Sequence, residues 1–333
     1  MDSRPMKVDV HAHVLPMGLL GWLSGVQLRG SVHVQKEVGG YWLRHASGLS
    51  HVVDPSFYDV GMRLSQMDRD GIDMSLLSLP ASVFFYDESP SMTVELVQVA
   101  NESVAGLLSQ SAGRLLGMGL LPMNDPTAAL TEAKRLRSLG LVGVELGTSV
   151  GTTMLDVPEF DAVYDQLVRD RLPIMLHPYL GIAGTALPGQ DKYHLSNCVG
   201  NPYETHLAAA RLMLGGVFDR HPDLRVVLTH GGGGLPYQLG RLDHAYTVRP
   251  EARVAALRPP REYLENFWFD TVVYDHASLE YLVGLVGRER VLFGTDRPYS
   301  MACPPGSWPS EGDVGLAGLH ENALALYGLS ARS

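Results

Sequence analysis

The sequence predicts an α/β fold, a (β/α)8 TIM barrel with a small β insertion after the first strand. Three observations predict it. Eight short apolar runs recur along 333 residues, segments with helical periodicity separate them, and most runs end in polar or glycine-rich residues. Near-continuous apolar character is typical of strands buried on both faces of a parallel sheet. Barrels of this length form one domain, so we expect residues 1–333 to be a single barrel domain.

The eight expected strands follow one another along the chain. They lie at residues 7–14, 74–80, 114–122, 141–148, 172–178, 224–234, 267–275 and 290–299. Between them, residues 125–140 and 157–171 show helical periodicity, and each of these segments opens with a proline near its start. Right-handed crossovers allow such a sheet to close. A doubly wound open sheet is the alternative, but no GxGxxG motif follows a strand.

Residues 18–55 interrupt the alternation of strands and helices. This stretch contains "SVHVQ" and "GGYWLRH", which are rich in aromatic and β-branched residues. We therefore expect a small β insertion after the first strand, over about residues 18–55.

Composition limits the partners of the chain. The formal net charge is −10, which disfavours binding to the phosphate backbone of nucleic acids. No apolar stretch reaches the roughly 18 residues of a membrane span, and no signal peptide is visible. The two cysteines form neither a CxxC pair nor a disulfide framework. We expect a soluble cytoplasmic protein that binds neither nucleic acid nor membrane.

Histidines and an aspartate recur where the expected strands end. They are His11 and His13 at the first strand, His177 at the fifth, His230 at the sixth and Asp296 at the eighth. The carboxyl ends of barrel strands meet at the active-site face, so these side chains should converge. Residues i and i+2 of a strand share a face, so both imidazoles of "HAH" should point the same way. Imidazoles combined with a carboxylate suit Zn²⁺ or a similar divalent ion.

Each of these residues also has a purely structural interpretation. A single histidine at a strand end is more often a satisfied polar residue than a ligand, and Asp296 in "GTDRP" could cap a turn. Five such groups at the same end of the strands are hard to obtain by chance, so their joint occurrence favours a functional site.

Five segments resemble one enzyme family and occur in its order. They are "DVHAHVLP", "MDRDGIDMSLLS", "PIMLHPY", "GGVFDRHPDLRVVLTHGGGGLPYQLGRLDHA" and "RVLFGTDRPY", and they extend over essentially the whole chain. The sequence thus resembles the metal-dependent, non-hydrolytic decarboxylases of the amidohydrolase superfamily, the branch that includes aminocarboxymuconate-semialdehyde decarboxylases. This resemblance implies a carboxy-lyase that acts non-oxidatively on an unsaturated or aromatic carboxylic acid, without an organic cofactor.

The resemblance also implies a role for each strand-end residue. One divalent ion, expected to be Zn²⁺ with Mn²⁺ as the alternative, would be held by four residues, His11, His13, His177 and Asp296. His230 would be the acid/base, and Asp296 would take part in catalysis beside binding the metal. Binuclear members of the superfamily bridge two metals with a carboxylated lysine on strand four. The fourth strand here carries Glu145 and no lysine, so one ion is expected.

Three further residues are expected to bind the substrate. Arg241 in "LGRLD" matches an arginine that, in the resembled enzymes, binds a substrate carboxylate across a dimer interface, so a homodimer is expected. His51 lies where those enzymes carry a second such arginine, although Arg44 and Arg63 are nearby, and Tyr193 lies near a tryptophan position. With one arginine missing, a hydroxybenzoate-like or other unsaturated acid is an alternative to the dicarboxylate muconate semialdehyde.

Two other classes of function share this set of ligands. A hydrolase that opens a lactone, or a hydratase of an unsaturated acid, could use the same residues, and CO₂ release without net uptake of water separates a decarboxylase from both. A barrel that binds zinc only for stability would have a metal site closed to solvent, and replacing His230 would cost it no activity.

Overall fold

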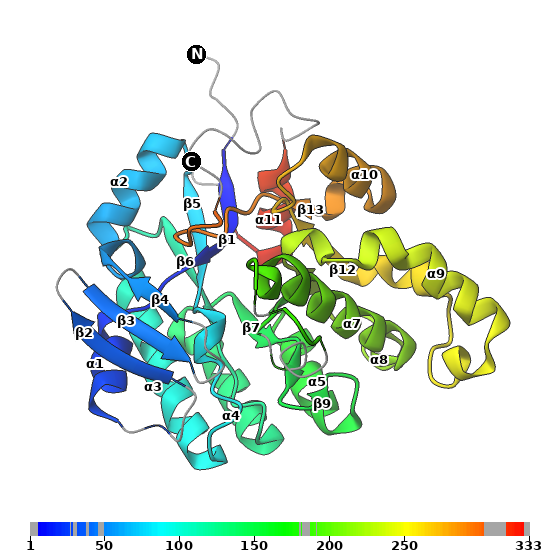
Figure 1. Ribbon diagram of the computed structural model, residues 1–333, viewed down its shortest axis with the longest axis horizontal. Coiled ribbons are helices and arrows are strands. Elements are labelled where there is room, and N and C mark those ends of the chain that lie inside the picture. Colours follow the sequence, from blue (N-terminus) through cyan, green and yellow to red (C-terminus); the bar gives the residue numbers. More distant parts are fainter. Residues whose placement is uncertain are drawn as a thin grey trace.

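Eight parallel strands form the centre of the molecule. The computed structural model describes residues 6–26, 28, 32–37, 40–45, 50–179, 181, 187–190, 192–302 and 318–329. The strands pair in the order β1-β5-β6-β7-β10-β11-β12-β13, and helices surround them (Figure 1). Their bounds are β1 (Val8–His13), β5 (Met74–Ser78), β6 (Leu115–Gly119), β7 (Gly143–Gly147), β10 (Ile174–His177), β11 (Val226–Leu228), β12 (Phe267–Asp270) and β13 (Val291–Leu292). The predicted (β/α)8 fold is confirmed.

The segment after β13 closes the sheet against β1. Asp296 N donates a hydrogen bond to His11 O at 2.7 Å. A parallel bridge between Ala12 and Arg297 continues this pairing beyond the last residue of β13. The last strand of the barrel therefore lies beside the first, and Asp296 lies beside the "HAH" segment.

Helices cover the outside of the barrel and the end at which its strands begin. Their bounds are α1 (Met17–Gly25), α2 (Val60–Asp70), α3 (Pro90–Leu108), α4 (Pro126–Leu136), α5 (Asp161–Arg169), α7 (Asn201–Leu214), α8 (Val217–Arg220), α9 (Leu235–Val248), α10 (His276–Val286) and α11 (Leu319–Tyr327). Leu326 and Tyr327 of α11 pack against Val8 and Leu292 at the start of the barrel. None of the helices in the described ranges is both long enough and apolar enough to cross a bilayer.

Side-chain caps stabilise the first turns of α2 and α4. Asp125 precedes α4, and its carboxylate accepts a hydrogen bond from Thr127 N at 3.1 Å, while Pro126 occupies the first turn. Asp59 caps α2 in the same way through Met62 N at 2.7 Å. The proline-led helix start expected at residue 126 is confirmed.

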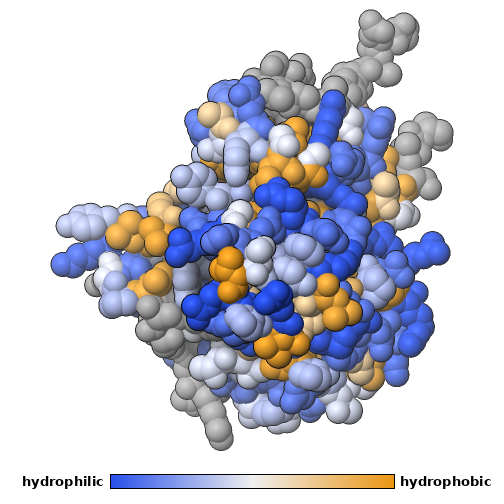
Figure 2. Space-filling view, turned by 90° about the vertical axis from the view of Figure 1, so that its right-hand side faces the viewer, coloured by the Kyte–Doolittle hydropathy of each residue, from blue (hydrophilic) through white to orange (hydrophobic). Residues whose placement is uncertain are grey.

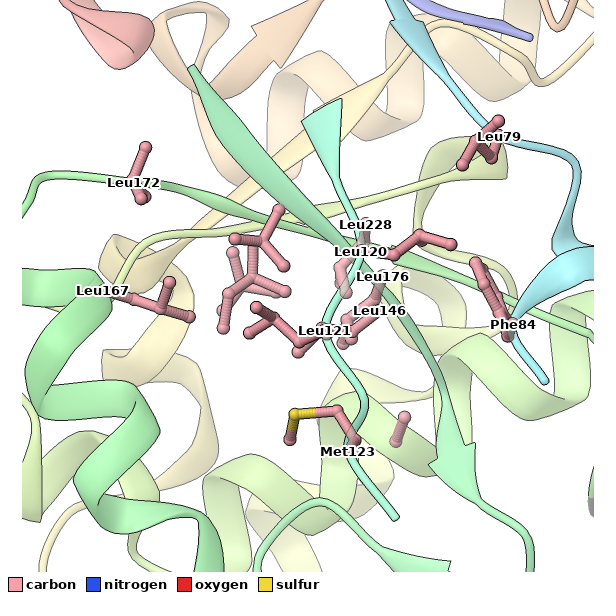
Figure 3. Packing of buried hydrophobic residues seen from close by; sticks show 14 of the residues in the cluster. Leu79, Phe84, Leu120, Leu121, Met123, Leu146, Leu167, Leu172, Leu176 and Leu228 are labelled. Atoms are coloured by element: carbon pink, nitrogen blue, oxygen red, sulfur yellow. The ribbon is translucent and has the colours of Figure 1, made fainter. Parts of the chain in front are cut away.

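Alternation along the strands separates the interior of the barrel from its helical coat. Leu146, Leu176 and Leu228 lie on β7, β10 and β11 and belong to the outer hydrophobic core, part of which Figure 3 shows. Met175, one residue before Leu176, belongs to the inner cluster instead. His177 therefore faces inward with Met175, because residues i and i+2 share a face.

The stretch between β1 and α2 is only partly β structure. Its antiparallel sheet consists of β2 (Val32–Glu37), β3 (Gly40–His45) and β4 (Ser50–Val53), and this sheet lies next to α1 at the side of the barrel (Figure 1). Its first part is the helix α1, so the expectation of β structure from residue 18 was wrong there. Leu19, Leu20 and Leu23 of α1 are buried, and their spacing places them on one helical face.

A second small β element is the hairpin of β8 (Ser149–Val150) and β9 (Thr153–Met154), which follows β7.

Candidate metal and active site

The strand-end residues selected from the sequence meet at one end of the barrel. The ligand atoms of His11, His177, His230 and Asp296 all lie within 4.8 Å of one another. His13 joins them, because its Nε2 lies 3.2 Å from His11 Nε2 and 3.1 Å from Asp296 Oδ1. Four histidines and one aspartate from distant parts of the chain thus form a single cluster, named the histidine cluster below.

A bulge in β1 sets the direction of its two histidines. The register with β5 shifts between Asp9 and Ala12. Val10 packs inside the barrel and Ala12 packs outside, whereas His11 and His13 both reach the cluster. Val10 and His11 are adjacent yet both face inward, which a regular strand does not allow. The common direction expected for the two imidazoles is therefore observed, and the bulge turns both of them toward the interior of the barrel.

Asp270 holds His11 from the end of β12. Its Oδ2 accepts a hydrogen bond from His11 Nδ1 at 2.6 Å, and its carboxylate also accepts from the N–H groups of His230 and Gly231 at 3.0 and 2.8 Å. This leaves His11 Nε2 facing Asp296, with 3.5 Å between Nε2 and Oδ1. A carboxylate behind a histidine is the usual support of a metal ligand. Asp270 is not among the residues selected from the sequence, although the strand-end rule that selected the histidines also applies to "FWFD".

Burial and neighbouring charges shift the pKa values of the cluster residues, and the result favours a cation. Burial opposes a charge on His11, but the hydrogen bond to Asp270 and the charge of Asp296 outweigh it and raise the pKa of His11 to about 9. Burial, followed by the charges of the other imidazoles, lowers the pKa of His177 well below its usual value. Burial alone would raise the pKa of Asp296, yet the neighbouring imidazoles hold it well below its usual range. The carboxylates therefore favour positive charge at this point, as a proton or as a metal ion.

The donor atoms of the cluster fit a divalent metal ion. His177 Nδ1 lies 2.8 Å from Pro178 O, and its Nε2 is buried with no hydrogen-bond partner among the described residues. Leaving a buried polar atom unpaired costs about 1–3 kcal/mol, so such an atom calls for a partner. Imidazole nitrogens with a carboxylate oxygen form the donor set that Zn²⁺ accepts, and Mn²⁺ also accepts carboxylate oxygen.

His230 lies at the more open side of the cluster. Its side chain is 14% exposed, compared with 0% for His11, and its Nε2 lies 3.8 Å from Asp296 Oδ2. His230 has a positive φ of 56°, a conformation that is strained for a residue with a side chain and that clusters at functional sites. Gly231 follows with a φ of 61°, and a Cβ there would lie 2.2 Å from Val273 Cγ1, so only glycine fits.

Two of the three residues expected to bind the substrate, Arg241 and Tyr193, lie outside the cluster within one chain. Arg241 is exposed on α9, and Tyr193 is 87% exposed in the segment before α7. His51 lies on β4, where its backbone pairs with Leu43, but its side chain is outside the part that the structure describes. The substrate contacts of these three residues therefore stay predictions.

Arg63, one of the two arginines near His51 in sequence, binds the backbone next to the site. It is buried on α2, and its Nη2 donates to His13 O at 2.5 Å and to Ser56 O at 2.9 Å. Burial lowers the pKa of Arg63 to about 10. Its hydrogen bonds show that this guanidinium holds the backbone of a cluster residue.

Replacing Asp270 by asparagine tests the support of His11. Asparagine keeps the size of the side chain but removes the charge that holds His11 Nδ1–H. We expect the affinity for Zn²⁺ to fall by about 10–100-fold, the usual effect of losing such a supporting carboxylate. Competition with a chelator measures this affinity, and circular dichroism checks that the variant is folded. An unchanged affinity would show that other contacts are sufficient to orient His11.

Comparisons with known proteins identify the family. The family profile described as "Amidohydrolase" matches residues 8–329. The chain is 32% identical over 310 residues to 2-amino-3-carboxymuconate-6-semialdehyde decarboxylase of Dictyostelium discoideum, covering 90% of this chain and 83% of that protein. It is 30% identical over 295 residues to gamma-resorcylate decarboxylase of Rhizobium sp. (strain MTP-10005), covering 81% and 84%. The crystal structure of Metarhizium anisopliae IDCase in apo form matches with a TM-score of 0.83 and 25% identity, covering 99% of both chains.

These matches extend along nearly the whole described barrel. The family profile includes every barrel strand, from β1 to β13, and the two curated relatives are named as decarboxylases. The resemblance inferred from the five sequence segments is confirmed. This chain belongs to the amidohydrolase family.

Proposed function

We propose that this chain is a metal-dependent, non-oxidative decarboxylase that acts on an unsaturated or aromatic carboxylic acid. The histidine cluster at the carboxyl ends of the barrel strands carries the proposal. Its chemistry suits a carbon–carbon lyase that uses no organic cofactor, and the curated relatives act as decarboxylases.

Four residues of the cluster would bind one divalent ion. We propose Zn²⁺ as this ion, with Mn²⁺ as the alternative, and the ligands His11, His13, His177 and Asp296. The unpaired Nε2 of His177 and the low pKa of Asp296 support this assignment. When bound, such an ion supplies a Lewis acid that polarises an oxygen of the substrate.

His230 would move the proton that the reaction consumes. Its side chain is partly exposed, and its Nδ1 has no hydrogen-bond partner among the described residues. In our proposal the His230 imidazolium gives a proton to the carbon that bears the carboxylate, while Asp296 stabilises the imidazolium charge. The bond between that carbon and the carboxylate then breaks, its electron pair restores the double bond or ring, and CO₂ leaves. Solvent returns the proton to His230.

The substrate carboxylate would be held across a dimer interface. We propose a homodimer in which Arg241 of each subunit reaches the other subunit's site and forms a bidentate pair with the carboxylate, with His51 and Tyr193 as further contacts. Around α9 the chain exposes large hydrophobic side chains, with Tyr237 82% and Val254 84% exposed. Figure 2 shows this side of the molecule, where hydrophobic residues form small groups among hydrophilic ones. Such a surface suits a mixed polar and apolar interface.

Mixing two inactive variants tests whether Arg241 acts across the interface. Arg241→Ala lacks the guanidinium that binds the substrate carboxylate, and His230→Asn lacks the acid/base, so each homodimer should be nearly inactive. In an equal mixture after subunit exchange, half of the dimers are mixed and one of their two sites is intact, so about a quarter of wild-type activity should return. Activity measured before and after exchange gives the result. No recovery, with exchange verified by mass, would show that Arg241 does not act in trans.

We further propose that the enzyme is cytoplasmic and that its partner is a small carboxylic acid. Cys198 is an exposed free thiol, which suits a reducing compartment. The net charge of −10 does not favour nucleic acid as a partner.

Release of CO₂ tests the proposed function. Protein treated with a chelator and protein reloaded with Zn²⁺ or Mn²⁺ are each incubated with γ-resorcylate and 2-amino-3-carboxymuconate-6-semialdehyde, the acids named for the two curated relatives. We expect CO₂ from at least one acid, only with reloaded protein and without consumption of oxygen. A product that keeps its carboxylate and gains water would instead favour the hydratase or hydrolase alternative.

A further inference from the structure

A cavity separate from the histidine cluster lies between α2 and the outer side of β1 and β5, and Figure 1 shows α2 beside these strands. Its volume is about 480 Å³, which is within the range of small-molecule sites. Asp9 of β1 and Ser75 of β5 lie opposite each other in the parallel register, and both line the cavity. Their neighbours Val10 and Leu76 pack inside the barrel, so Asp9 and Ser75 face outward. This cavity, named the α2 pocket below, is therefore on the other side of β1 from the metal site.

A buried cation lines the α2 pocket without an ion-pair partner among the described residues. Arg63 is buried, and within the described part of the chain its hydrogen bonds run from Nη2 to the carbonyl oxygens of His13 and Ser56. Its Nε and Nη1 bind no acceptor there. Buried arginines are nearly always paired with an anion, because burial removes the hydration of the charge. Arg63 therefore calls for an anionic partner, and the α2 pocket has room for one.

The carboxylates near the pocket are bound to other groups. Both oxygens of Asp9 accept hydrogen bonds from Thr295, Oδ1 from its N–H at 3.1 Å and Oδ2 from its hydroxyl at 2.7 Å. Asp70, at the end of α2, pairs with Arg297. Neither carboxylate forms an ion pair with Arg63, so an anion from solution can take that place.

The rest of the lining indicates what kind of anion fits. Ser75 Oγ is buried and has no hydrogen-bond partner among the described residues, so it offers a second donor in the pocket of Arg63. Met62, Met67 and Ile72 form an apolar wall. Methionine side chains are flexible and adapt to ligands of different shapes. A cation, a hydroxyl donor and an apolar wall together suit a carboxylate that is attached to an apolar body.

We propose that the α2 pocket is a binding site for a small monocarboxylic acid. The carboxylate pairs with the N–H groups of Arg63 that have no acceptor and accepts a hydrogen bond from Ser75 Oγ. The apolar part of the acid lies against the two methionines of the pocket, Met62 and Met67. The inference is independent of the proposed function, because neither the metal ligands nor the acid/base take part in this site.

The two methionines of the pocket make binding measurable. Protein with ¹³C-labelled methionine methyl groups is titrated with benzoate, and the signals are assigned with Met62→Leu and Met67→Leu. Met175 packs inside the barrel, so its signal detects binding at the metal site instead. We expect saturable shifts of the Met62 and Met67 signals. Benzamide lacks the charge and inorganic phosphate lacks the apolar body, so each should bind at least about tenfold more weakly than benzoate.

Two variants of the pocket are compared with the matched control Arg114→Gln. Arg114 also donates to a backbone carbonyl, that of Ile72 at 2.7 Å, but it pairs with Asp68 and does not line the pocket. We expect the dissociation constant of benzoate to rise at least about tenfold in Arg63→Gln, because a hydrogen-bonded charge is lost. It should rise about 2–10-fold in Ser75→Ala, which loses a neutral hydrogen bond, and stay within about threefold in the control.

Several results would overturn the inference. They are a benzoate titration without saturable shifts of Met62 and Met67, an equal loss of binding in Arg63→Gln and Arg114→Gln, and binding of benzamide or phosphate as tight as that of benzoate. Circular dichroism shows whether each variant is folded. If Arg63→Gln does not fold, Ser75→Ala decides, and an unchanged dissociation constant in that variant would contradict the proposed site.

Discussion

His177→Ala should abolish both metal binding and CO₂ release. The Nε2 of His177 is buried and has no hydrogen-bond partner among the described residues, and His177 belongs to both groups of side chains that could hold an ion there. Removing a ligand should cost more than removing a supporting residue, so we expect metal affinity to fall by more than about 100-fold. Elemental analysis after dialysis and a CO₂ assay with limiting metal measure the two effects.

His221→Ala is the matched control for this variant. His221 is also buried, but its ring nitrogens lie 2.9 Å and 3.1 Å from Asp165 and Asp161, away from the histidine cluster. Its loss should lower stability while metal content stays at the wild-type level. Full metal content in His177→Ala would contradict the assignment of His177 as a ligand.

His230→Asn should retain its metal and lose most of its turnover. His230 is the acid/base of the proposed mechanism, and proton transfer by such a group contributes about 10²–10⁴-fold to the rate. We therefore expect kcat to fall by about this factor, with metal content unchanged. Stopped assays of CO₂ and elemental analysis of the same sample give both numbers.

Chemical rescue distinguishes a proton donor from a structural residue. Added imidazole should restore part of the turnover of His230→Gly, because it can enter the space of the missing ring and carry the proton. A ring nitrogen of His230 also lies within 4.8 Å of the ligand atoms of His11, His177 and Asp296. Loss of metal from His230→Asn would therefore show that His230 is a ligand. Unchanged turnover of the same variant would show that His230 is not the acid/base.

The barrel and the cluster could be predicted because both depend on local signals. Each strand is a short apolar run, and its last residues mark the carboxyl end of the barrel. His11, His13, His177, His230 and Asp296 all occupy such ends, so one rule selected them. The helix α1 was missed because the aromatic and β-branched residues that follow it dominated our interpretation of residues 18–55.

Other parts of the site depend on information that a strand pattern does not contain. Glu145 lies in the middle of a strand that is buried on both faces, so hydrophobicity does not show whether its side chain points inward. The bulge in β1 changes the inward and outward alternation of side chains between Asp9 and Ala12, and no residue type in this segment predicts a bulge. The role proposed for Arg241 requires a second subunit, whose position does not follow from the fold of one chain.

The central claim is that a carboxylate is exchanged for a proton at one carbon atom. The most direct test is to let the metal-loaded protein react in D₂O with the acid that it converts fastest, and to measure the CO₂ released and the deuterium in the product. The account predicts one CO₂ per product molecule and one deuterium at the carbon that carried the carboxylate, with neither effect in chelator-treated protein. A product that keeps its carboxylate and gains the elements of water, or an absence of CO₂ from every acid, would contradict it.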